Sequence, residues 1–150
     1  MLNYFNVKMI NILDNKSVSK DEILKKLVFN MSENSNLIVD RDIFYKEVLQ
    51  RENVGTTGIG MGVAIPHART EVVKDIVVSV ALLKNPIDFN SLDGEKVKIV
   101  ILVGVPKGES KKYLELLSSL SRIFRDKKIR ESILESTTTE CLIEAIAEIG

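Results

Sequence analysis

IVVSVALL, residues 76–83, and IVILVGV, residues 99–105, decide the fold of this chain of 150 residues. Both stretches are rich in β-branched residues, and neither alternates apolar with polar side chains, which is typical of strands covered on both faces. The segment between them carries Asp93-Gly94, a dipeptide that favours a tight turn. The sequence therefore predicts two neighbouring central strands joined by a hairpin-like excursion.

Further predicted elements flank these two strands. We expect weaker strands at residues 5–12 and 62–65. Five helices are predicted. The first follows a Ser19/Glu22 capping box, and the second runs from Asp40 to about Arg51. The third follows a capping Ser110, the fourth follows Asp126, and the fifth follows a Thr137/Glu140 capping box. Because strands and helices interleave, the sequence predicts one α/β domain over residues 1–150, with a mixed central sheet between helices on both faces.

Composition limits the kinds of site that the chain can build. With 45% hydrophobic and 28% charged residues, it is typical of an ordinary globular domain. It has one cysteine, Cys141, and one histidine, His67, which excludes a metal site built from several Cys or His ligands. We expect no cofactor. Cys141 falls on the apolar stripe of the last predicted helix, where we expect a buried small hydrophobe.

Charge and hydropathy limit the partners. The 21 Lys and Arg residues balance 21 Asp and Glu residues, so no net field is available to hold nucleic acid or an anionic membrane. The first residues lack the basic start and long apolar stretch of a secretory signal. The longest apolar runs are far shorter than the roughly 20 residues of a membrane helix. We expect a soluble cytoplasmic protein with no nucleic-acid partner and no direct membrane insertion.

The residues with chemical potential concentrate between Arg51 and His67. Four of the chain's eight glycines lie within residues 55–62. Glycines at alternate positions remove side chains and leave backbone N–H groups open to close approach by an anion. Val63 stands where a dinucleotide fingerprint needs its third glycine, and no Gly-Lys-Ser/Thr follows as in a Walker loop. The segment therefore indicates an anion site of another kind.

His67 follows a short strand-like run and Pro66, whose missing N–H discourages further sheet pairing. We therefore expect the histidine at a strand end, where loops carry functional groups on a rigid support. An imidazole with a pKa of about 6.5 is mostly neutral at pH 7, and one ring nitrogen can then act as a nucleophile. A turn or surface residue without a chemical role is the other interpretation of a solitary histidine here.

Arg51 follows Phe44 and Val48 on one face of the predicted helix, so its guanidinium can project along the buried side. Two interpretations stay open for this cation. It can complement the dipole at the helix carboxyl end, which contributes up to about 1 kcal/mol. Alternatively, its planar fork can bind phosphate oxygens, at roughly 1.5–3 kcal/mol for each charge-assisted hydrogen bond.

Arg51-Glu52 and the run TGIGMGVAIPH, residues 57–67, resemble a known active-site signature. It is that of type 2 enzyme IIA, of the fructose/mannitol class, in the bacterial phosphoenolpyruvate-dependent sugar phosphotransferase system. Residues 87–109 and 113–124 resemble later parts of the same family. The resemblance implies the type 2 enzyme IIA fold and a phosphotransferase component. Such a component takes a phosphoryl group from the phosphocarrier HPr onto a histidine and passes it to a cysteine of the IIB domain of a fructose-type sugar permease.

The resemblance also implies roles for individual residues. His67 matches the histidine that is phosphorylated, and Arg51 matches the active-site arginine that offsets the phosphoryl charge. Thr57, Gly58 and Gly60 are candidate donors of hydrogen bonds to the phosphoryl oxygens. A phosphohistidine intermediate divides one transfer into two steps, and few residues are required because such transfer is mostly positioning and charge stabilisation.

Tyr113 stands where many relatives carry a second histidine. Its phenol can donate a hydrogen bond to a phosphoryl oxygen, yet it carries no positive charge at neutral pH. The other interpretation is an aromatic residue that packs on the apolar stripe of its helix.

Besides sugar transport, two other functions are therefore compatible with these residues. In a nitrogen-type regulatory enzyme IIA, phosphorylation of His67 would control binding to a regulatory partner. An anion-binding module, or a hydrolase with His67 as general base, is the third hypothesis, and the chain lacks the Gly-x-Ser-x-Gly motif of many hydrolases.

Overall fold

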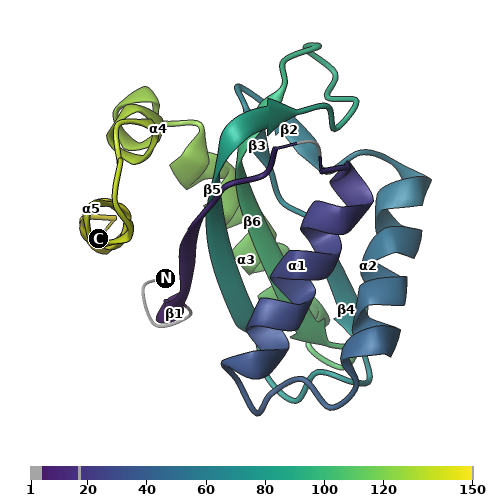
Figure 1. The fold of residues 1–150 in the computed structure, drawn as a ribbon. Coiled ribbons are helices and arrows are strands. Elements are labelled where there is room, and N and C mark those ends of the chain that lie inside the picture. Colours follow the sequence, from purple (N-terminus) through teal and green to yellow (C-terminus); the bar gives the residue numbers. More distant parts are fainter. Residues whose placement is uncertain (1–4, 17, 150) are drawn as a thin grey trace.

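A mixed six-stranded sheet lies between two layers of helices in this computed structural model, which describes residues 5–16 and 18–149 (Figure 1). In chain order, the elements are β1 (Phe5–Leu13), α1 (Lys20–Glu33), α2 (Arg41–Val54), β2 (Gly58–Gly60), β3 (Val63–Ala64), β4 (His67–Thr70), β5 (Val77–Ile87), β6 (Val97–Pro106), α3 (Ser110–Phe124), α4 (Lys127–Leu134) and α5 (Thr139–Ala147). The predicted α/β class, with helices on both faces of a mixed sheet, is confirmed.

The two predicted central strands are neighbours. β5 pairs antiparallel with β6, beginning with Val77 opposite Gly104, and the strand order is β1-β5-β6-β3-β2 with β4 also paired to β6. Their connection contains the predicted turn, in which Gly94 has a φ of +74° and donates its N–H to the Ser91 carbonyl. Nearly every residue in the middle of both strands is buried, which explains the absence of apolar–polar alternation in their sequences.

Each face of the sheet has its own hydrophobic core. The first core joins the sheet to α1 and α2 and includes Leu24, Phe44 and Val48, all completely buried. The second core joins the opposite face to α3, α4 and α5 and includes Leu120 and Phe124. These helices form because their apolar residues recur at helical spacing and cover one face of the sheet. Within the described residues, the helices are too short or too polar to cross a membrane.

The helix starts agree with three predictions and correct two others. Ser19 is the N-cap of α1, as its capping box predicts, and the predicted starts near Asp40 and after Asp126 agree with the N-caps of α2 and α4, which are Asp40 and Asp126. Ser110 is the first residue of α3 rather than its cap, and its hydroxyl accepts a hydrogen bond from Arg69 Nη1 at 2.7 Å. Thr138, not Thr137, caps α5, because the Thr138 hydroxyl accepts the Cys141 N–H at 3.1 Å.

Cys141 is exposed, so the expectation of a buried cysteine is wrong. The helical register gives the reason. Leu142, Ala145 and Ile146 are the residues of α5 that face the second core. The residue before Leu142 lies about 100° away around the helix and therefore points outside this stripe.

The strand after Pro66 also differs from the prediction. Sheet pairing was expected to stop there, yet β4 runs parallel to β6 with His67 opposite Val103. β3 precedes β4 in the same register along β6. Ile65 and Pro66 therefore interrupt one continuous pairing for two residues. Pro66 lacks an N–H but keeps its carbonyl, which accepts the Val103 N–H at 3.0 Å.

Candidate functional site

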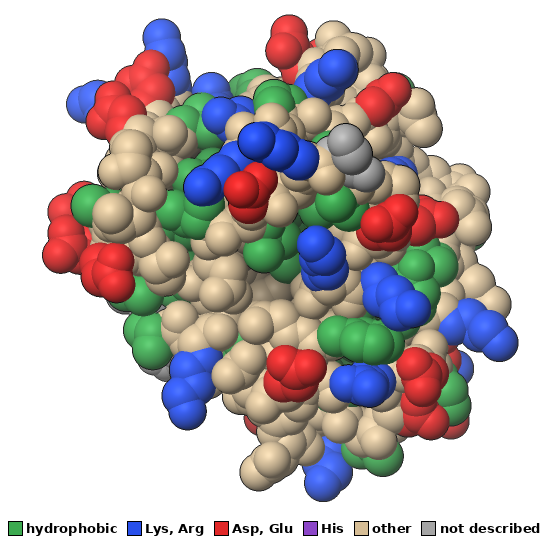
Figure 2. Space-filling view, in the orientation of Figure 1, with side chains coloured by type: hydrophobic (Ala, Val, Ile, Leu, Met, Phe, Trp, Pro, Cys, Tyr) green, Lys and Arg blue, Asp and Glu red, His purple; other side chains and the backbone are tan. Residues whose placement is uncertain are grey.

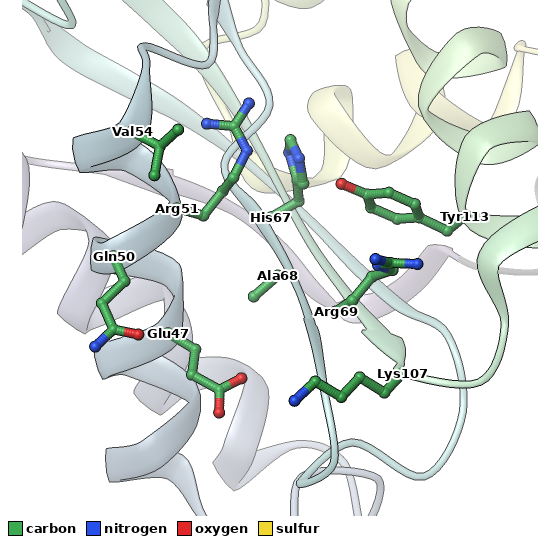
Figure 3. Close-up of a pocket in the computed structure, with 9 residues that line it drawn as sticks. All are labelled: Glu47, Gln50, Arg51, Val54, His67, Ala68, Arg69, Lys107 and Tyr113. Atoms are coloured by element: carbon green, nitrogen blue, oxygen red, sulfur yellow. The ribbon is translucent and has the colours of Figure 1, made fainter.

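A cavity of about 440 Å³ opens beside His67 (Figure 3). The residues that line it are Glu47, Gln50, Arg51 and Val54 from α2, His67, Ala68 and Arg69 from β4, Lys107 just after β6, and Tyr113 from α3. Three of these side chains are cations and one is an anion, so the cavity favours a negatively charged ligand. In residues 5–16 and 18–149, no group of three His, Cys, Asp or Glu side chains is placed to hold a metal ion.

The positive character of this cavity is not shared by the face that α1 and α2 form (Figure 2). Over the face formed by α1 and α2, acidic and basic side chains are interspersed (Figure 2). This pattern agrees with the balance of 21 basic and 21 acidic residues. Recognition of an anion therefore depends on local geometry rather than on the net charge of the molecule.

His67 is the first residue of β4 and has only 6% of its surface exposed. Its Nδ1 lies 2.7 Å from the carbonyl oxygen of Ile65. Because a carbonyl oxygen only accepts, Nδ1 carries the proton of the neutral ring and donates it to this bond. The other ring nitrogen, Nε2, keeps its lone pair and is the atom available for attack.

The surroundings of His67 favour the neutral ring. Burial lowers the pKa of His67 below its ordinary value of 6.5, because desolvation disfavours the imidazolium. The hydrogen bond to Ile65 and the charge of Glu52 oppose this shift, whereas the charge of Arg51 adds to it. The net effect is a lowered pKa, which keeps the ring neutral and nucleophilic at pH 7.

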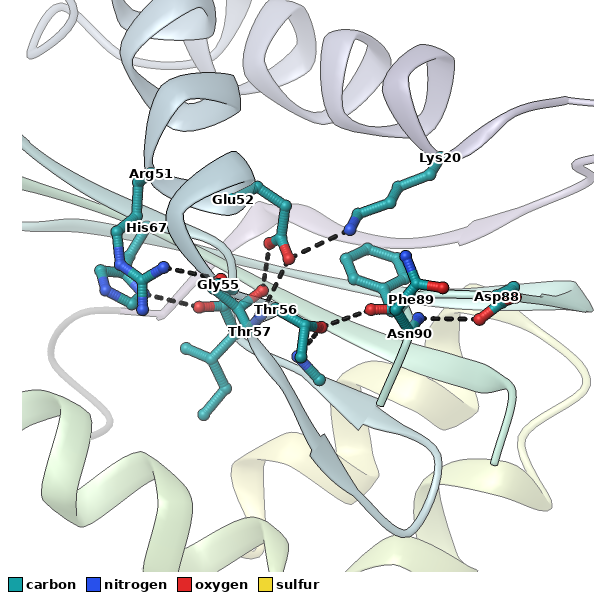
Figure 4. A network of polar contacts seen from close by, with 12 residues as sticks. Lys20, Arg51, Glu52, Gly55, Thr56, Thr57, His67, Asp88, Phe89 and Asn90 are labelled. Carbon is teal, nitrogen blue, oxygen red and sulfur yellow. Dashed lines mark hydrogen bonds and ion pairs between the residues drawn. The ribbon is translucent and has the colours of Figure 1, made fainter. Parts of the chain in front are cut away.

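Arg51 lies in the last turn of α2, and its guanidinium extends over the cavity beside His67 (Figures 3 and 4). Its Nη1 donates to the carbonyl of Gly55 at 2.8 Å, which ties the side chain to the residue that ends the helix. A guanidinium has five N–H donors, and this bond uses one of them. The structure thus brings the predicted histidine and arginine to one cavity, with donors to spare for an anion.

Tyr113 also belongs to this cavity. Its ring centroid is 5.6 Å from that of His67, with the two planes inclined by 56°, and its hydroxyl end points toward the imidazole (Figure 3). The ring packs partly against the second core as well. Both interpretations of this residue therefore have a structural basis, because a packed ring holds the phenol beside His67.

The sequence pattern does not single out Arg69, which the structure places in the cavity wall. Its guanidinium carbon is 5.1 Å from the ring centroid of Tyr113, and its Nη1 donates to Ser110. Arg69 follows His67 by two residues on one strand, so both side chains project to the same face. That alternation is the signal in the sequence that would have found it, once β4 was known to be a strand.

Lys107 and Glu47 complete the charged lining. They point toward one another across the cavity (Figure 3). Glu47 could be found from the sequence, since it precedes Arg51 by four residues on the same helix face. Lys107 gives no such signal, because it reaches the cavity only through the pairing of β4 with β6.

Thr57, Gly58 and Gly60 lie behind the cavity and do not line it. Thr57 is 5% exposed, and both its hydroxyl and its N–H donate to the carboxylate of Glu52, the N–H at 2.8 Å. Gly58 donates its N–H to the Thr56 hydroxyl at 3.0 Å. These polar groups are used to hold the glycine-rich segment together.

Gly60 belongs to the tight turn between β2 and β3. Gly60, Met61 and Gly62 have φ angles of +94°, +58° and +79°, and the Met61 N–H donates to the Asp93 carboxylate at 2.8 Å. The Met61 and Glu95 N–H groups hold the pKa of Asp93 below its ordinary value. The anion that contacts the backbone of the glycine-rich segment is therefore the carboxylate of Asp93, a residue of this chain.

Comparison with known proteins gives a consistent result. The family model for "Phosphoenolpyruvate-dependent sugar phosphotransferase system, EIIA 2" matches residues 3–149. A curated relative from Haloferax volcanii, the PTS system fructose-specific EIIA component, is 31% identical over 124 residues, which cover 83% of this chain and 80% of the relative.

Solved structures share the fold. The nitrogen regulatory protein IIA-Ntr from Neisseria meningitidis has a TM-score of 0.86 at 29% identity, over 99% of this chain and 97% of its own. Enzyme IIA for mannitol from Escherichia coli, solved in complex with phosphorylated enzyme IIB, has a TM-score of 0.77 at 19% identity, over 96% of this chain and 99% of its own. The second likeness is one of fold alone.

Proposed function

This chain belongs to the EIIA 2 family of the phosphoenolpyruvate-dependent sugar phosphotransferase system, and we propose that it is a phosphocarrier that works through His67. His67 takes a phosphoryl group from phospho-HPr and passes it to a cysteine of a IIB domain in fructose-type sugar uptake. The observation that carries this proposal is the free Nε2 of a buried, neutral imidazole at the wall of a cationic cavity. We assign residues 1–150 to one domain, and we expect the exchange to take place in the cytoplasm.

The chemical step needs little besides a lone pair and a well-placed positive charge. The lone pair of Nε2 attacks phosphorus and forms an Nε2–P bond. The bond from phosphorus to the donor breaks, and its electron pair leaves with the donor. The proton on Nδ1 stays where it is, bonded to the Ile65 carbonyl, so the phosphorylated ring carries a formal positive charge that the negative phosphoryl group and this carbonyl stabilise.

The lining residues stabilise the charge of the transferred group. Arg51 approaches from the α2 side of His67, and Arg69 and Lys107 come from the other side. Fixed cations in a partly closed site act more strongly than in water, because less solvent screens them. The Tyr113 hydroxyl can donate a further hydrogen bond to a phosphoryl oxygen. We assign Thr57, Gly58 and Gly60 to the support of this site, since their donors are engaged within the chain.

A regulatory role is the second candidate, and one observation favours it. The match to the nitrogen regulatory protein IIA-Ntr extends over nearly the whole chain at a TM-score of 0.86. In this alternative, phosphorylation of His67 adds negative charge at the cavity and so controls binding to a regulatory partner. The chemistry at His67 is the same, and only the next recipient differs.

The proposal is tested by phosphorylation with labelled phosphoenolpyruvate, enzyme I and HPr. We expect label on the protein in an acid-labile, alkali-stable bond, and we expect His67→Ala to carry none. Gln50→Ala changes a neutral lining side chain and is the control, which should label normally. Undiminished label on His67→Ala would contradict the proposal, because another nucleophile would then carry the phosphoryl group.

The same labelled protein separates the two candidate roles. It is mixed with purified IIB domains of different sugar classes, and the label on each IIB is measured. Transfer to a fructose-type IIB in preference to the others supports sugar transport. Retention of the label with every IIB supports the regulatory alternative.

A further inference from the structure

A buried carboxylate lies behind the cavity (Figure 4). Glu52 is 6% exposed and accepts three hydrogen bonds. The Thr57 N–H donates to Oε2 at 2.8 Å, Lys20 Nζ donates to the same oxygen at 3.1 Å, and the Thr57 hydroxyl donates to Oε1. A buried charge is tolerated only when it is paired and hydrogen-bonded. Glu52 and its two partners therefore form a fixed unit.

This unit connects to the reacting ring through two further hydrogen bonds. The carbonyl of Thr57 accepts the Ile65 N–H at 3.0 Å. The carbonyl of Ile65 in turn accepts the Nδ1 proton of His67 at 2.7 Å. Ile65 is one of the two residues at which the pairing with β6 is interrupted, and its N–H is held by Thr57 rather than by the ladder of β6.

The orientation of that carbonyl decides which nitrogen of His67 is free. A neutral imidazole has two tautomers, and the hydrogen bond made by one nitrogen selects between them. With the proton on Nδ1, the Nε2 lone pair is free to attack phosphorus. If the Ile65 carbonyl turned away, the tautomer with its proton on Nε2 would be populated, and that nitrogen could not attack.

We propose that Glu52 and Thr57 are positioning residues that, through the backbone of Ile65, keep the proton of His67 on Nδ1 and so leave Nε2 free. The inference deepens the proposed function and rests on it. Neither side chain lines the cavity, so both hold the proton on Nδ1 through other groups.

The single histidine makes the test direct, because nitrogen-15 NMR of its ring reports one residue. Thr57→Val removes the hydroxyl that donates to Glu52 and keeps the shape of the side chain. Thr56→Val is the matched control, because it removes a hydroxyl of the same segment that bonds to Phe89 and Gly58 instead. Glu52→Gln removes the charge at nearly constant volume.

We expect Thr57→Val and Glu52→Gln to move part of the His67 population to the Nε2–H tautomer. We expect phosphorylation to slow about tenfold in both, the effect of losing one hydrogen bond to a charged group. Thr57→Ser, which restores the hydroxyl, should restore the tautomer and the rate. Thr56→Val should keep the tautomer of the parent.

An unchanged tautomer in folded Thr57→Val and Glu52→Gln would overturn the inference. An equal change in Thr56→Val would also overturn it, since any loosening of the segment would then suffice. If Thr57→Val does not fold, Glu52→Gln decides by the same spectrum. The spectrum needs no phosphoryl donor, so a parent protein that HPr fails to label would refute the proposed function separately.

Discussion

At the scale of the residue, the protonation of His67 is set by burial and by the charges around it. Burial and the Arg51 cation lower its pKa, and the bond to Ile65 and the Glu52 carboxylate raise it. Burial and the Arg51 charge both destabilise the imidazolium, and removal of Arg51 leaves burial alone to do so. The charge on the ring and the charge offered to an anion in the cavity are therefore coupled through one guanidinium.

We predict that a titration of His67 followed by NMR gives a pKa below 6.5, and that Arg51→Ala raises it toward that value. Loss of a neighbouring cation makes protonation easier, which fixes the sign of the change. Arg41→Ala is the control, because Arg41 lies at the other end of the same helix and over the ring of Phe29. A pKa above 6.5 in the parent, or a decrease in Arg51→Ala, would contradict this account.

The residues that the sequence locates are those with a local signal. His67 and Arg51 stand out through their spacing and the glycines between them, and both line the cavity. Glu52 belongs to the signature, but its role escapes prediction because its partners, Lys20 and Thr57, lie on different elements. A buried ion pair that joins distant elements has no periodic pattern in the sequence.

At the scale of the element, the turn between β2 and β3 depends on glycine for two reasons. Gly60 has a φ of +94°, and a Cβ there would lie 2.9 Å from Asp93 Oδ2. An L side chain is strained in this backbone region, and the nearest atom belongs to the carboxylate that binds the turn.

We predict that Gly60→Ala lowers the free energy of unfolding by about 1–3 kcal/mol, through strain at a positive φ and loss of close approach to Asp93. Urea denaturation measures this change. Gly108→Ala is the matched control, since a Cβ at that position meets nothing within 4 Å, and it should leave the stability nearly unchanged. Equal midpoints for the two variants would show that the turn does not need this glycine.

The elements that the sequence predicts correctly have strong patterns of their own. β5, β6 and the five helices follow from continuous apolar runs, helical spacing and capping residues. The sequence does not predict β4. Proline removes only its own N–H from sheet pairing, whereas the residues after Pro66, from His67 on, pair with β6. The cap of α5 shifts by one residue because three consecutive threonines, residues 137–139, offer nearly equivalent hydroxyls.

At the scale of the molecule, the sheet separates two cores, and the cavity draws on both. Arg51 belongs to α2, which packs on the first core, and Tyr113 belongs to α3, which packs on the second. β4 lies between them and carries His67. The fold class could be predicted from local patterns, but this convergence could not, because it depends on which strands pair.

We predict that Ile23→Val in the first core and Ile133→Val in the second each cost about 0.5–1.5 kcal/mol of stability. Both side chains are completely buried. Their effects should add to within about 0.5 kcal/mol, because the sheet lies between them and they share no partner cluster. A double-mutant cycle in urea measures the coupling, and a coupling above about 1 kcal/mol would mean that the sheet transmits strain between the cores.

The connection between β5 and β6 reaches back to the glycine-rich segment at two points. Phe89 accepts a hydrogen bond from the Thr56 hydroxyl, and Asp93 accepts one from the Met61 N–H. Moving the glycine-rich segment and His67 to another scaffold would therefore require two separate pieces of chain, residues 51–67 together with residues 88–95. A graft of residues 51–67 alone would lack Phe89 and Asp93, the two hydrogen-bond acceptors that hold the segment in place.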